Sequence, residues 1–356
     1  MPPPLSRFSR DCLRGSRLLY EMARKTINQV LLNPQAYPHK PQEIELVQSQ
    51  MSFIFLTGEY VYKIKKPVNL GYLDYTTLEK RHFFCHQELE LNRRLCPGAY
   101  LAVVPIVEEK GELRIEGRGK AIEYAVKMKQ LPQERMMDVL LPQGQVTPEM
   151  IARVAEKLVG FHQKAETNQE IVAFGKLDVI RQNTDENFAQ TEKYIGTSIT
   201  TEEYQHIKNY TDNFVDSNAS LFDKRVREGK IKDCHGDLHA AHVCFIDDIC
   251  IYDCIEFNDR FRYSDMASEI AFLAMDLDRY QQAGLSRHLV NTYVELSHDE
   301  ELLKLLNFYK CYRAYVRGKV ESFKLDDPCI PEGEKARILS VARSYFKLAE
   351  SYTLGE

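Results

Sequence analysis

One stretch of this chain constrains its fold more than any other: His-Gly-Asp-Leu-His-Ala-Ala-His, from His235 to His242, followed eleven residues later by Asp253. Between them, segments 243–246 and 249–252 are short and strand-like, and they flank a turn-favouring Asp-Asp pair. If this pair forms the turn, residue 243 faces residue 252 and His242 faces Asp253. Directly opposed residues hold their Cβ atoms about 4.5–5.5 Å apart, close enough to bind one cation. We therefore expect a β-hairpin that carries a metal site.

The same stretch matches the catalytic loop of protein kinases, which reads His-Arg-Asp-Leu-x-x-x-Asn. His235, Asp237 and Leu238 are in register with that pattern, and His242 occupies the Asn position. A carboxylate there accepts a hydrogen bond from the substrate hydroxyl, so we expect Asp237 to be the catalytic base. We expect His235 to fix the loop backbone, and Asp253 to bind the Mg²⁺ that bridges the nucleotide phosphates. The alternative is that both carboxylates only cap local backbone groups.

The composition is that of a globular protein with two domains or one two-lobed domain. The 356 residues are 44% hydrophobic, and the net charge of -5 argues against a nucleic-acid partner. No apolar run approaches the roughly 18 residues of a membrane span, so no membrane association is expected. Nine cysteines without a C-x-x-C pair predict reduced thiols and a cytoplasmic location. The acidic stretch 247–278 is compatible with a cationic substrate, and the oligomeric state is unknown from sequence.

The element pattern predicts an α+β, two-lobed fold with a small antiparallel β N-lobe and a large, mainly helical C-lobe. The predicted parts are an N-terminal extension that is partly flexible (1–44), a β-rich N-lobe with one helix that binds the nucleotide (45–128), a hinge connector (129–134) and a helical C-lobe that carries the catalytic loop and the substrate site (135–356). Predicted strands are 53–56, 60–65, 101–107, 113–115 and 121–128. Predicted helices in the C-lobe start after Thr147-Pro148 and cover 264–277, 299–323 and 332–352, and only the hairpin at 243–252 interrupts them.

A Lys–Glu pair is the second candidate site. Thr76 and Glu79 form a capping box that predicts a helix from Thr76 to Leu95. Its expected inner face is Phe84, Glu88, Leu91 and Leu95. A carboxylate within an apolar stripe needs a partner, and the preceding strand offers Lys63 and Lys65 on one face. In a kinase such a Lys pairs with the helix Glu and holds the nucleotide phosphates. We prefer Lys63 and leave Lys65 open; the alternative is that Glu88 and both lysines are merely solvated.

Three other polar residues have less defined roles. His162 lies on the apolar face of its helix and is expected to be a core histidine with satisfied hydrogen bonds. Asp265 is expected to cap the helix that follows it, with a contact to the catalytic loop as the alternative. For His239, a position facing the substrate and a packed position are equally compatible with the sequence.

These motifs resemble the aminoglycoside phosphotransferase family, a branch of the protein-kinase-like fold. The matching residues are His235-Gly236-Asp237, His242 in the Asn position and Tyr252-Asp253, and the runs 251–263, 62–68 and 91–95 resemble an uncharacterised bacterial subgroup. The resemblance covers about residues 45–325. It implies ATP or GTP bound between the lobes near Met128, Lys129 and Gln130, with Mg²⁺ as the metal. It also implies phosphate transfer to a hydroxyl of a small molecule.

Two departures from the family pattern leave alternatives open. His242 replaces an Asn, and imidazole suits Mn²⁺ or Zn²⁺ better than Mg²⁺. No Gly-rich loop precedes Phe53. One alternative is therefore a nucleotide-binding pseudokinase that acts by interaction. Another is a metal-dependent hydrolase that uses His235, Asp237, His239, His242 and Asp253.

Overall fold

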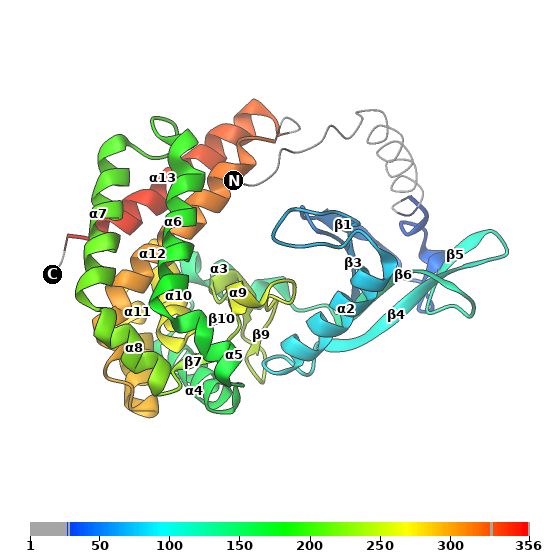
Figure 1. The fold of residues 1–356 in the computed structure, drawn as a ribbon. Coiled ribbons are helices and arrows are strands. Elements are labelled where there is room, and N and C mark those ends of the chain that lie inside the picture. The colour runs from blue at the N-terminus through cyan, green and yellow to red at the C-terminus, as the bar shows by residue number, and fades with distance from the viewer. Residues whose placement is uncertain (1–26, 28, 328–329, 355–356) are drawn as a thin grey trace. The chain divides into compact units, whose positions relative to one another are not determined.

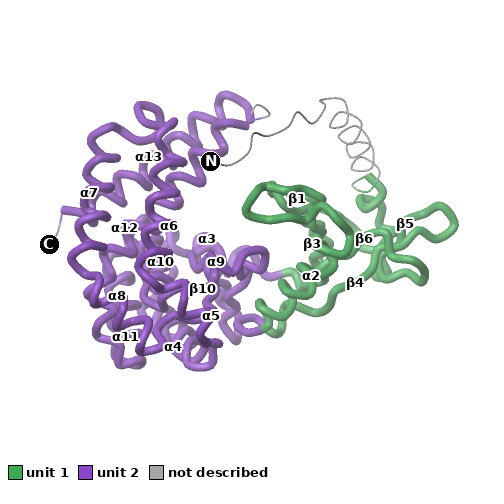
Figure 2. Tube along the Cα trace, viewed as in Figure 1, with its two compact units in different colours: residues 1–93, 97–130 green, residues 94–96, 131–356 purple. Residues whose placement is uncertain are grey.

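The structure is a computed structural model that describes residues 27, 29–327 and 330–354 (Figure 1). The chain divides into two compact units: unit 1 is 1–93 with 97–130, and unit 2 is 94–96 with 131–356 (Figure 2). Most of the predicted N-terminal extension lies outside the described residues. Its described part from residue 29 onward belongs to unit 1, where Leu31, Ala36 and Tyr37 are buried in the core.

Unit 1 is a six-stranded antiparallel sheet in the order β1-β2-β3-β6-β4-β5. Its strands are β1 (Glu45–Gln48), β2 (Ser52–Leu56), β3 (Tyr60–Lys65), β4 (Tyr100–Glu109), β5 (Glu112–Ile115) and β6 (Ala121–Lys129). Alternation along β3 directs Tyr62 and Ile64 into the core. The predicted strands are all present, and β1 adds an edge strand that the sequence pattern did not reveal.

One helix, α2 (Leu78–Arg93), packs against β6 and β4 in unit 1. Thr77, rather than the predicted Thr76, caps it, because the Thr77 hydroxyl oxygen accepts from the Lys80 N–H at 3.2 Å. Of the predicted inner face, Glu88 is buried within the helix and Leu95 is buried just beyond its end, whereas Phe84 and Leu91 are only partly buried. The buried residues of the helix itself are Arg81, Cys85, Glu88, Leu89 and Asn92. The reason is a buried ion pair with β6, in which the Arg81 guanidinium contacts the Glu123 carboxylate at 2.8–3.0 Å. The ion pair between the helix and the sheet thus outweighs the apolar periodicity of the helix.

Unit 2 is mainly helical (Figure 1). Its helices are α3 (Met137–Leu140), α4 (Pro148–Lys164), α5 (Gln169–Val172), α6 (Leu177–Thr191), α7 (Thr201–Ser217), α8 (Ala219–Arg227), α9 (Asp259–Arg262), α10 (Met266–Arg279), α11 (Ala283–Ser297), α12 (Leu302–Lys324) and α13 (Glu332–Ser351). The almost fully buried α10 packs against α11 and α12, while α4 packs on α11 and α13 on α12. As predicted, Thr147 caps α4, accepting from the Met150 N–H at 3.4 Å.

Two short strand pairs interrupt the helices, where the sequence predicted only one. β8 (Val243–Cys244) pairs with β9 (Cys250–Ile251), and β7 (Ile231–Asp233) pairs with β10 (Tyr263–Asp265). The second pair occupies residues 264–265, so α10 begins at Met266 instead of Ser264. As predicted, the Asp265 side chain caps α10, accepting from the Ala267 N–H at 2.8 Å. β7 leads into the His235 loop and β10 into α10, so their pairing brings the loop beside this helix.

The cysteines differ from the expectation of reduced thiols at one pair. Cys96 and Cys250, both in unit 2, form a disulfide across 154 residues of sequence. The other described cysteines are buried: Cys85, Cys234, Cys244, Cys254 and Cys311. Cys12 and Cys329 lie outside the described residues. Sequence spacing gave no sign of the pair, because the two Cα atoms come within 4.7 Å only through tertiary packing.

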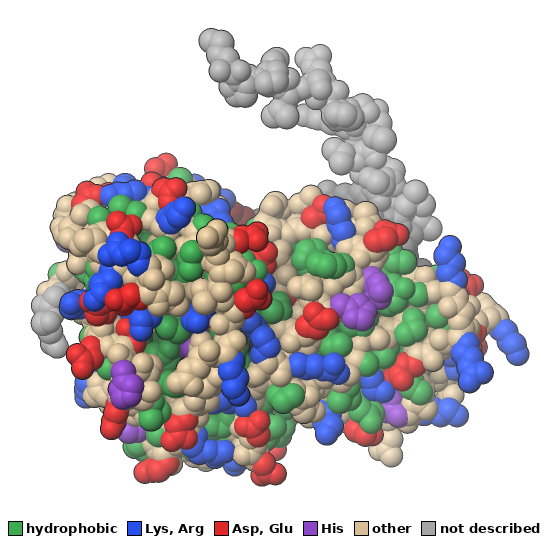
Figure 3. Space-filling view, turned by 60° about the horizontal axis from the view of Figure 1, so that its bottom comes forward, with side chains coloured by type: hydrophobic (Ala, Val, Ile, Leu, Met, Phe, Trp, Pro, Cys, Tyr) green, Lys and Arg blue, Asp and Glu red, His purple; other side chains and the backbone are tan. Residues whose placement is uncertain are grey.

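Charged side chains of both signs are spread over the face of the molecule shown in Figure 3. Among the described helices, none combines the length and the apolarity needed to cross a lipid bilayer.

Candidate functional site

The His235 loop is held by one buried carboxylate, Glu269 on α10. Its oxygens accept from the backbone N–H groups of His235, at 2.8 and 3.1 Å, and of Gly236, at 2.8 Å. Glu269 Oε2 also lies 2.8 Å from His162 Nε2. Burial alone would raise the pKa of Glu269, but the hydrogen bonds from His162 and the loop lower it to about 2. Sequence reasoning missed this anchor, which lies within an otherwise apolar helix.

His162 is the core histidine that the sequence predicted, although it also supports the site. It is buried, and its Nδ1 lies 2.8 Å from the Tyr293 hydroxyl. Because its Nε2 contacts Glu269, His162 orients the carboxylate that carries the loop.

Backbone geometry places Asp237 at the tip of a tight turn. Gly236 has φ +88°, and a Cβ there would lie 2.8 Å from the Phe261 carbonyl oxygen, so glycine is required. His235 is fully buried; its Nε2 donates to the Tyr252 carbonyl oxygen at 2.9 Å, and its Nδ1 accepts from the Asp237 N–H at 3.3 Å. Burial lowers the pKa of His235, in keeping with a neutral ring. Both ring nitrogens are occupied, which argues against His235 as a metal ligand.

The Asp237 carboxylate lies among basic groups. Its Oδ2 is 3.6 Å from His239 Nε2 and 3.6 Å from His242 Nδ1, and its side chain is 31% exposed. Desolvation would raise the pKa of Asp237, but His239, His242 and Arg317 hold it well below the ordinary value. The side chain is thus an ionised hydrogen-bond acceptor at neutral pH.

The predicted hairpin register is wrong by one residue. Val243 pairs with Ile251 rather than with residue 252, and residues 245–249 form the connection instead of a two-residue turn. Arg135 explains the shorter ladder: its carbonyl oxygen accepts from the Phe245 N–H at 2.9 Å, and its Nε donates to the Phe245 carbonyl at 2.8 Å. The backbone at Phe245 is therefore unable to extend the pairing of β8 with β9.

His242 and Asp253 nevertheless meet, by a different route. Tyr252 is the residue opposite His242, since its N–H donates to the His242 carbonyl at 3.0 Å. Asp253 then turns into the left-handed region, with φ +62°, an uncommon conformation for a residue other than glycine. This turn ends the extended strand, and Asp253 Oδ2 lies 3.6 Å from His242 Nε2.

The tautomer of His242 follows from its other contact. Its Nδ1 lies 2.8 Å from the Asp237 carbonyl oxygen, which can only accept, so Nδ1 carries the proton. Burial first, and His239 second, lower the pKa of His242 to about 4. The neutral ring therefore directs the lone pair of Nε2 toward the side of Asp253. A backbone carbonyl that fixes the tautomer in this way is typical of a metal-binding histidine.

The Lys–Glu cluster lies in unit 1. Glu88 is fully buried, and its two carboxylate oxygens contact Lys63 Nζ at 2.8 Å and Lys65 Nζ at 2.7 Å. The Lys65 side chain is 1% exposed and also contacts the Tyr75 hydroxyl at 3.4 Å, whereas Lys63 is 12% exposed. Both lysines thus lie on the face that strand alternation predicted.

The predicted nucleotide contacts Met128, Lys129 and Gln130 lie at the end of β6. The Lys129 N–H donates to the Ala99 carbonyl at 2.8 Å, and the Gln130 N–H to the Glu59 carbonyl at 3.0 Å. These two backbone donors are used within unit 1, so further contacts there would have to come from carbonyl oxygens and side chains.

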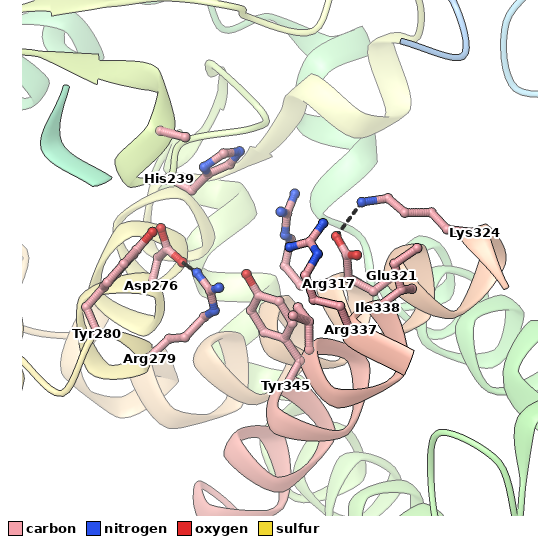
Figure 4. A pocket seen from close by; sticks show the side chains of 12 residues that line it. His239, Asp276, Arg279, Tyr280, Arg317, Glu321, Lys324, Arg337, Ile338 and Tyr345 are labelled. Atoms are coloured by element: carbon pink, nitrogen blue, oxygen red, sulfur yellow. Dashed lines mark hydrogen bonds and ion pairs between the residues drawn. The ribbon is translucent and has the colours of Figure 1, made fainter. Parts of the chain in front are cut away.

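A pocket of about 210 Å³ lies beside the His235 loop in unit 2 (Figure 4). Its lining comes from the loop and from α10, α12 and α13: His239, Ala241, Asp276, Arg279, Tyr280, Arg317, Glu321, Lys324, Arg337, Ile338, Val341 and Tyr345. Asp276 joins the pocket to the loop, because its Oδ2 accepts from the Ala240 N–H at 2.9 Å. No sequence motif indicated these residues, which are spread over about 100 positions.

Sequence comparison finds relatives of this chain in two mycobacteria. The chain is 31% identical over 279 residues to an uncharacterised protein of Mycobacterium tuberculosis and to another of Mycobacterium bovis. The match covers 78% of this chain and 54% of each relative, so the chain spans about half the length of the curated relatives it matches. A search against protein-family models found no match.

Two solved structures share the fold at 11% identity. One is an amicoumacin kinase in complex with AMP-PNP, Ca²⁺ and Ami, with a TM-score of 0.53 over 91% of this chain and 93% of that one. The other is a choline/ethanolamine kinase family protein from Mesorhizobium loti, with a TM-score of 0.50 over 93% of this chain and 99% of that one. The predicted α+β, protein-kinase-like fold is thereby confirmed, and with it the expected resemblance in fold to small-molecule phosphotransferases.

Proposed function

We propose that this chain is a small-molecule kinase that transfers the γ-phosphate of ATP, or of GTP, to a hydroxyl group. The observation that carries the proposal is the arrangement around Asp237. A glycine turn presents this ionised carboxylate, and the buried Glu269 anchors the turn. The imidazole of His242 and the carboxylate of Asp253 lie within 3.6 Å of each other beside it. The fold is one that small-molecule kinases use, although fold alone does not transmit a substrate.

In the proposed reaction Asp237 accepts a hydrogen bond from the acceptor hydroxyl and orients its oxygen. A bond forms between that oxygen and the γ-phosphorus, while the bond from the γ-phosphorus to the β,γ-bridging oxygen breaks. The hydroxyl proton passes to Asp237, and the products are the phosphate ester and the nucleoside diphosphate. The low pKa of Asp237 suits a group that orients the hydroxyl and takes its proton late, as a loose transition state requires.

The donor set at the end of the hairpin fits a divalent cation. His242 Nε2 and the Asp253 carboxylate are the proposed ligands, and the hydrogen bond at His242 Nδ1 leaves Nε2 able to donate its lone pair. A bound Mg²⁺ or Mn²⁺ would neutralise phosphate charge. The nitrogen donor favours Mn²⁺ relative to an all-oxygen site. Asp237, His239 and His242 also offer ligand atoms within 4.8 Å of one another.

For the nucleotide we propose Lys63 as the phosphate-binding group and Glu88 as its positioning partner. The greater exposure of Lys63 supports this choice over Lys65, whose side chain is buried between Glu88 and Tyr75. Met128, Lys129 and Gln130 remain the proposed contacts for the base. We also propose a cytoplasmic location, which a nucleoside triphosphate as phosphate donor supports.

The test compares Asp237→Asn with wild type in assays of ADP formation with Mg²⁺ and with Mn²⁺. We expect turnover to fall by at least about a hundredfold, since the general base contributes about 10²–10⁴-fold. Asp216→Asn, on the exposed surface of α7, is the matched control and should behave as wild type. Equal turnover in Asp237→Asn and wild type would refute the proposal. Nucleotide binding without turnover under either metal would favour the pseudokinase, and stoichiometric Zn²⁺ without nucleotide binding would favour the hydrolase.

A further inference from the structure

The charge of the pocket beside the catalytic loop identifies a class of acceptor. We infer that the acceptor is a small hydroxylated anion, whose carboxylate or phosphate group binds Arg317 while its hydroxyl faces Asp237. This inference rests on the proposed kinase function and gives that function a substrate class. An anionic acceptor differs from the cationic substrate with which the acidic stretch 247–278 was compatible.

The pocket lining contains four permanent cations and two carboxylates. The cations are Arg279, Arg317, Lys324 and Arg337, which come from α10, α12 and α13 (Figure 4). Both carboxylates are already paired with basic groups. Arg279 lies 3.5 Å from Asp276, and Lys324 Nζ lies 2.7 Å from Glu321 Oε1. The lining therefore has an excess of two positive charges, which disfavours a cationic ligand.

Arg317 is the cation best placed to bind the acceptor. Its guanidinium lies 5.7 Å from the centroid of the Tyr345 ring and interacts with the Tyr345 hydroxyl. Among the described residues no carboxylate lies within ion-pair distance of this guanidinium, and its buried Nε has no hydrogen-bond partner there. Arg337, by contrast, is largely exposed and pairs with Glu334. The Arg317 guanidinium is partly buried, and a buried N–H donor such as its Nε is costly unless an acceptor satisfies it. A planar carboxylate or a phosphate matches its fork of N–H groups.

The position of Arg317 relates the pocket to the chemistry. Arg317 and residues of the His235 loop line the same pocket. The same pocket includes His239, which lies 3.6 Å from the Asp237 carboxylate. An anion held by Arg317 would thus place a neighbouring hydroxyl on the side of the base. The volume of the pocket, about 210 Å³, lies below the roughly 300–1,000 Å³ of pockets for drug-sized ligands, so we expect the acceptor to be a small metabolite.

The experiment measures nucleotide-dependent ADP formation by the full chain with a size-matched panel of hydroxyl compounds. The anionic arm has hydroxy acids and sugar acids in one set and sugar phosphates in another, which separates carboxylate from phosphate. The other arms are uncharged sugars and polyols, and amino alcohols with aminoglycosides. We expect only an anionic set to stimulate turnover. Arg317→Gln should raise the KM for that compound about ten- to a hundredfold, the effect of losing a charged hydrogen bond.

Two controls separate a binding role from a structural one. Arg317→Lys keeps the charge without the planar fork and should recover part of the affinity. Arg287→Gln removes an exposed Arg on α11, outside the pocket, and should leave KM and basal ATP hydrolysis at wild-type values. Thermal melting of each variant identifies any that fails to fold. If Arg317→Gln does not fold, the KM of Arg317→Lys is compared with that of wild type instead.

The outcomes distinguish this inference from the proposed function. Turnover that persists in Asp237→Asn refutes the kinase assignment itself. Asp237-dependent turnover that is stimulated by a cationic or uncharged compound overturns only the anionic acceptor. The inference also fails if no anionic compound alters ADP formation, or if Arg317→Gln leaves the KM of the anion unchanged.

Discussion

Glu269 allows a quantitative test of how the His235 loop is held. This buried carboxylate accepts from two loop N–H groups and lies 2.8 Å from His162. Its pKa, lowered from 4.5 to about 2, corresponds to about 3 kcal/mol of folding free energy at neutral pH, at 1.36 kcal/mol per tenfold change in proton affinity. Glu269→Gln replaces the charge by an isostere of the protonated acid, so we expect it to lose about 3 kcal/mol at pH 7.

The sign of the pH dependence follows from the direction of the pKa. A carboxyl group whose pKa is lower in the folded state stabilises the protein fully above its unfolded pKa, here about 4.5, and loses that contribution as pH falls toward about 2. The difference in unfolding free energy between wild type and Glu269→Gln should therefore be constant from pH 7 to pH 5. At pH 3.5 it should shrink to about 2 kcal/mol.

Urea denaturation followed by circular dichroism at pH 7, 5 and 3.5 measures this difference. Glu295→Gln, on the exposed surface of α11, is the control and should stay within about 0.5 kcal/mol of wild type at each pH. ADP formation should also fall in Glu269→Gln, because the loop that presents Asp237 loses its anchor. A difference below about 1 kcal/mol at pH 7, or one that is the same at pH 7 and 3.5, would refute the reasoning.

Two further predictions concern the loop backbone and the disulfide. Gly236→Ala should destabilise the protein by about 1–3 kcal/mol and reduce ADP formation, because φ is +88° and the added Cβ would meet the Phe261 carbonyl; melting curves and the turnover assay measure both effects. Cys250→Ser removes the link to Cys96 and should cost about 2–5 kcal/mol in urea denaturation, since the closed loop spans 154 residues.

Each of these two predictions has its own control. Gly284→Ala tests the same substitution where a Cβ meets open space, and it should be nearly neutral; equal losses in both glycine variants would contradict the steric argument. For the disulfide, wild type treated with dithiothreitol should match Cys250→Ser. A wild type that is insensitive to the reductant, with Cys250→Ser equally stable, would show that the link does not stabilise the fold.

Local patterns in the sequence predicted much of the fold. Strand alternation in β3 placed Lys63 and Lys65 on the face that meets Glu88. The Thr147-Pro148 start of α4 was equally readable, because capping depends on neighbouring residues. The loop from His235 to His242 was found because its residues are consecutive. In each case the information lies within a few positions of sequence.

The errors arose where distant residues compete for the same groups. Arg135 occupies the backbone of Phe245 and shortens the hairpin, so the register moved by one residue. The Arg81–Glu123 ion pair directs Arg81 of α2 toward the sheet, in place of the apolar stripe that the sequence predicted. Arg135 lies far from Phe245 in the sequence, and Arg81 lies far from Glu123. Local periodicity therefore gives no sign of either pairing.

The amino-acid sequence by itself determined the identity of the chemical groups: a carboxylate in the loop, an imidazole five residues after it, and a second carboxylate after a short strand. Tertiary structure alone decided how they are held and what surrounds them. Glu269 reaches the loop from α10, and Arg317 reaches the pocket from α12. The physical reason is that hydrogen bonds and charges act over a few ångströms in space, whereas sequence patterns record only neighbours along the chain.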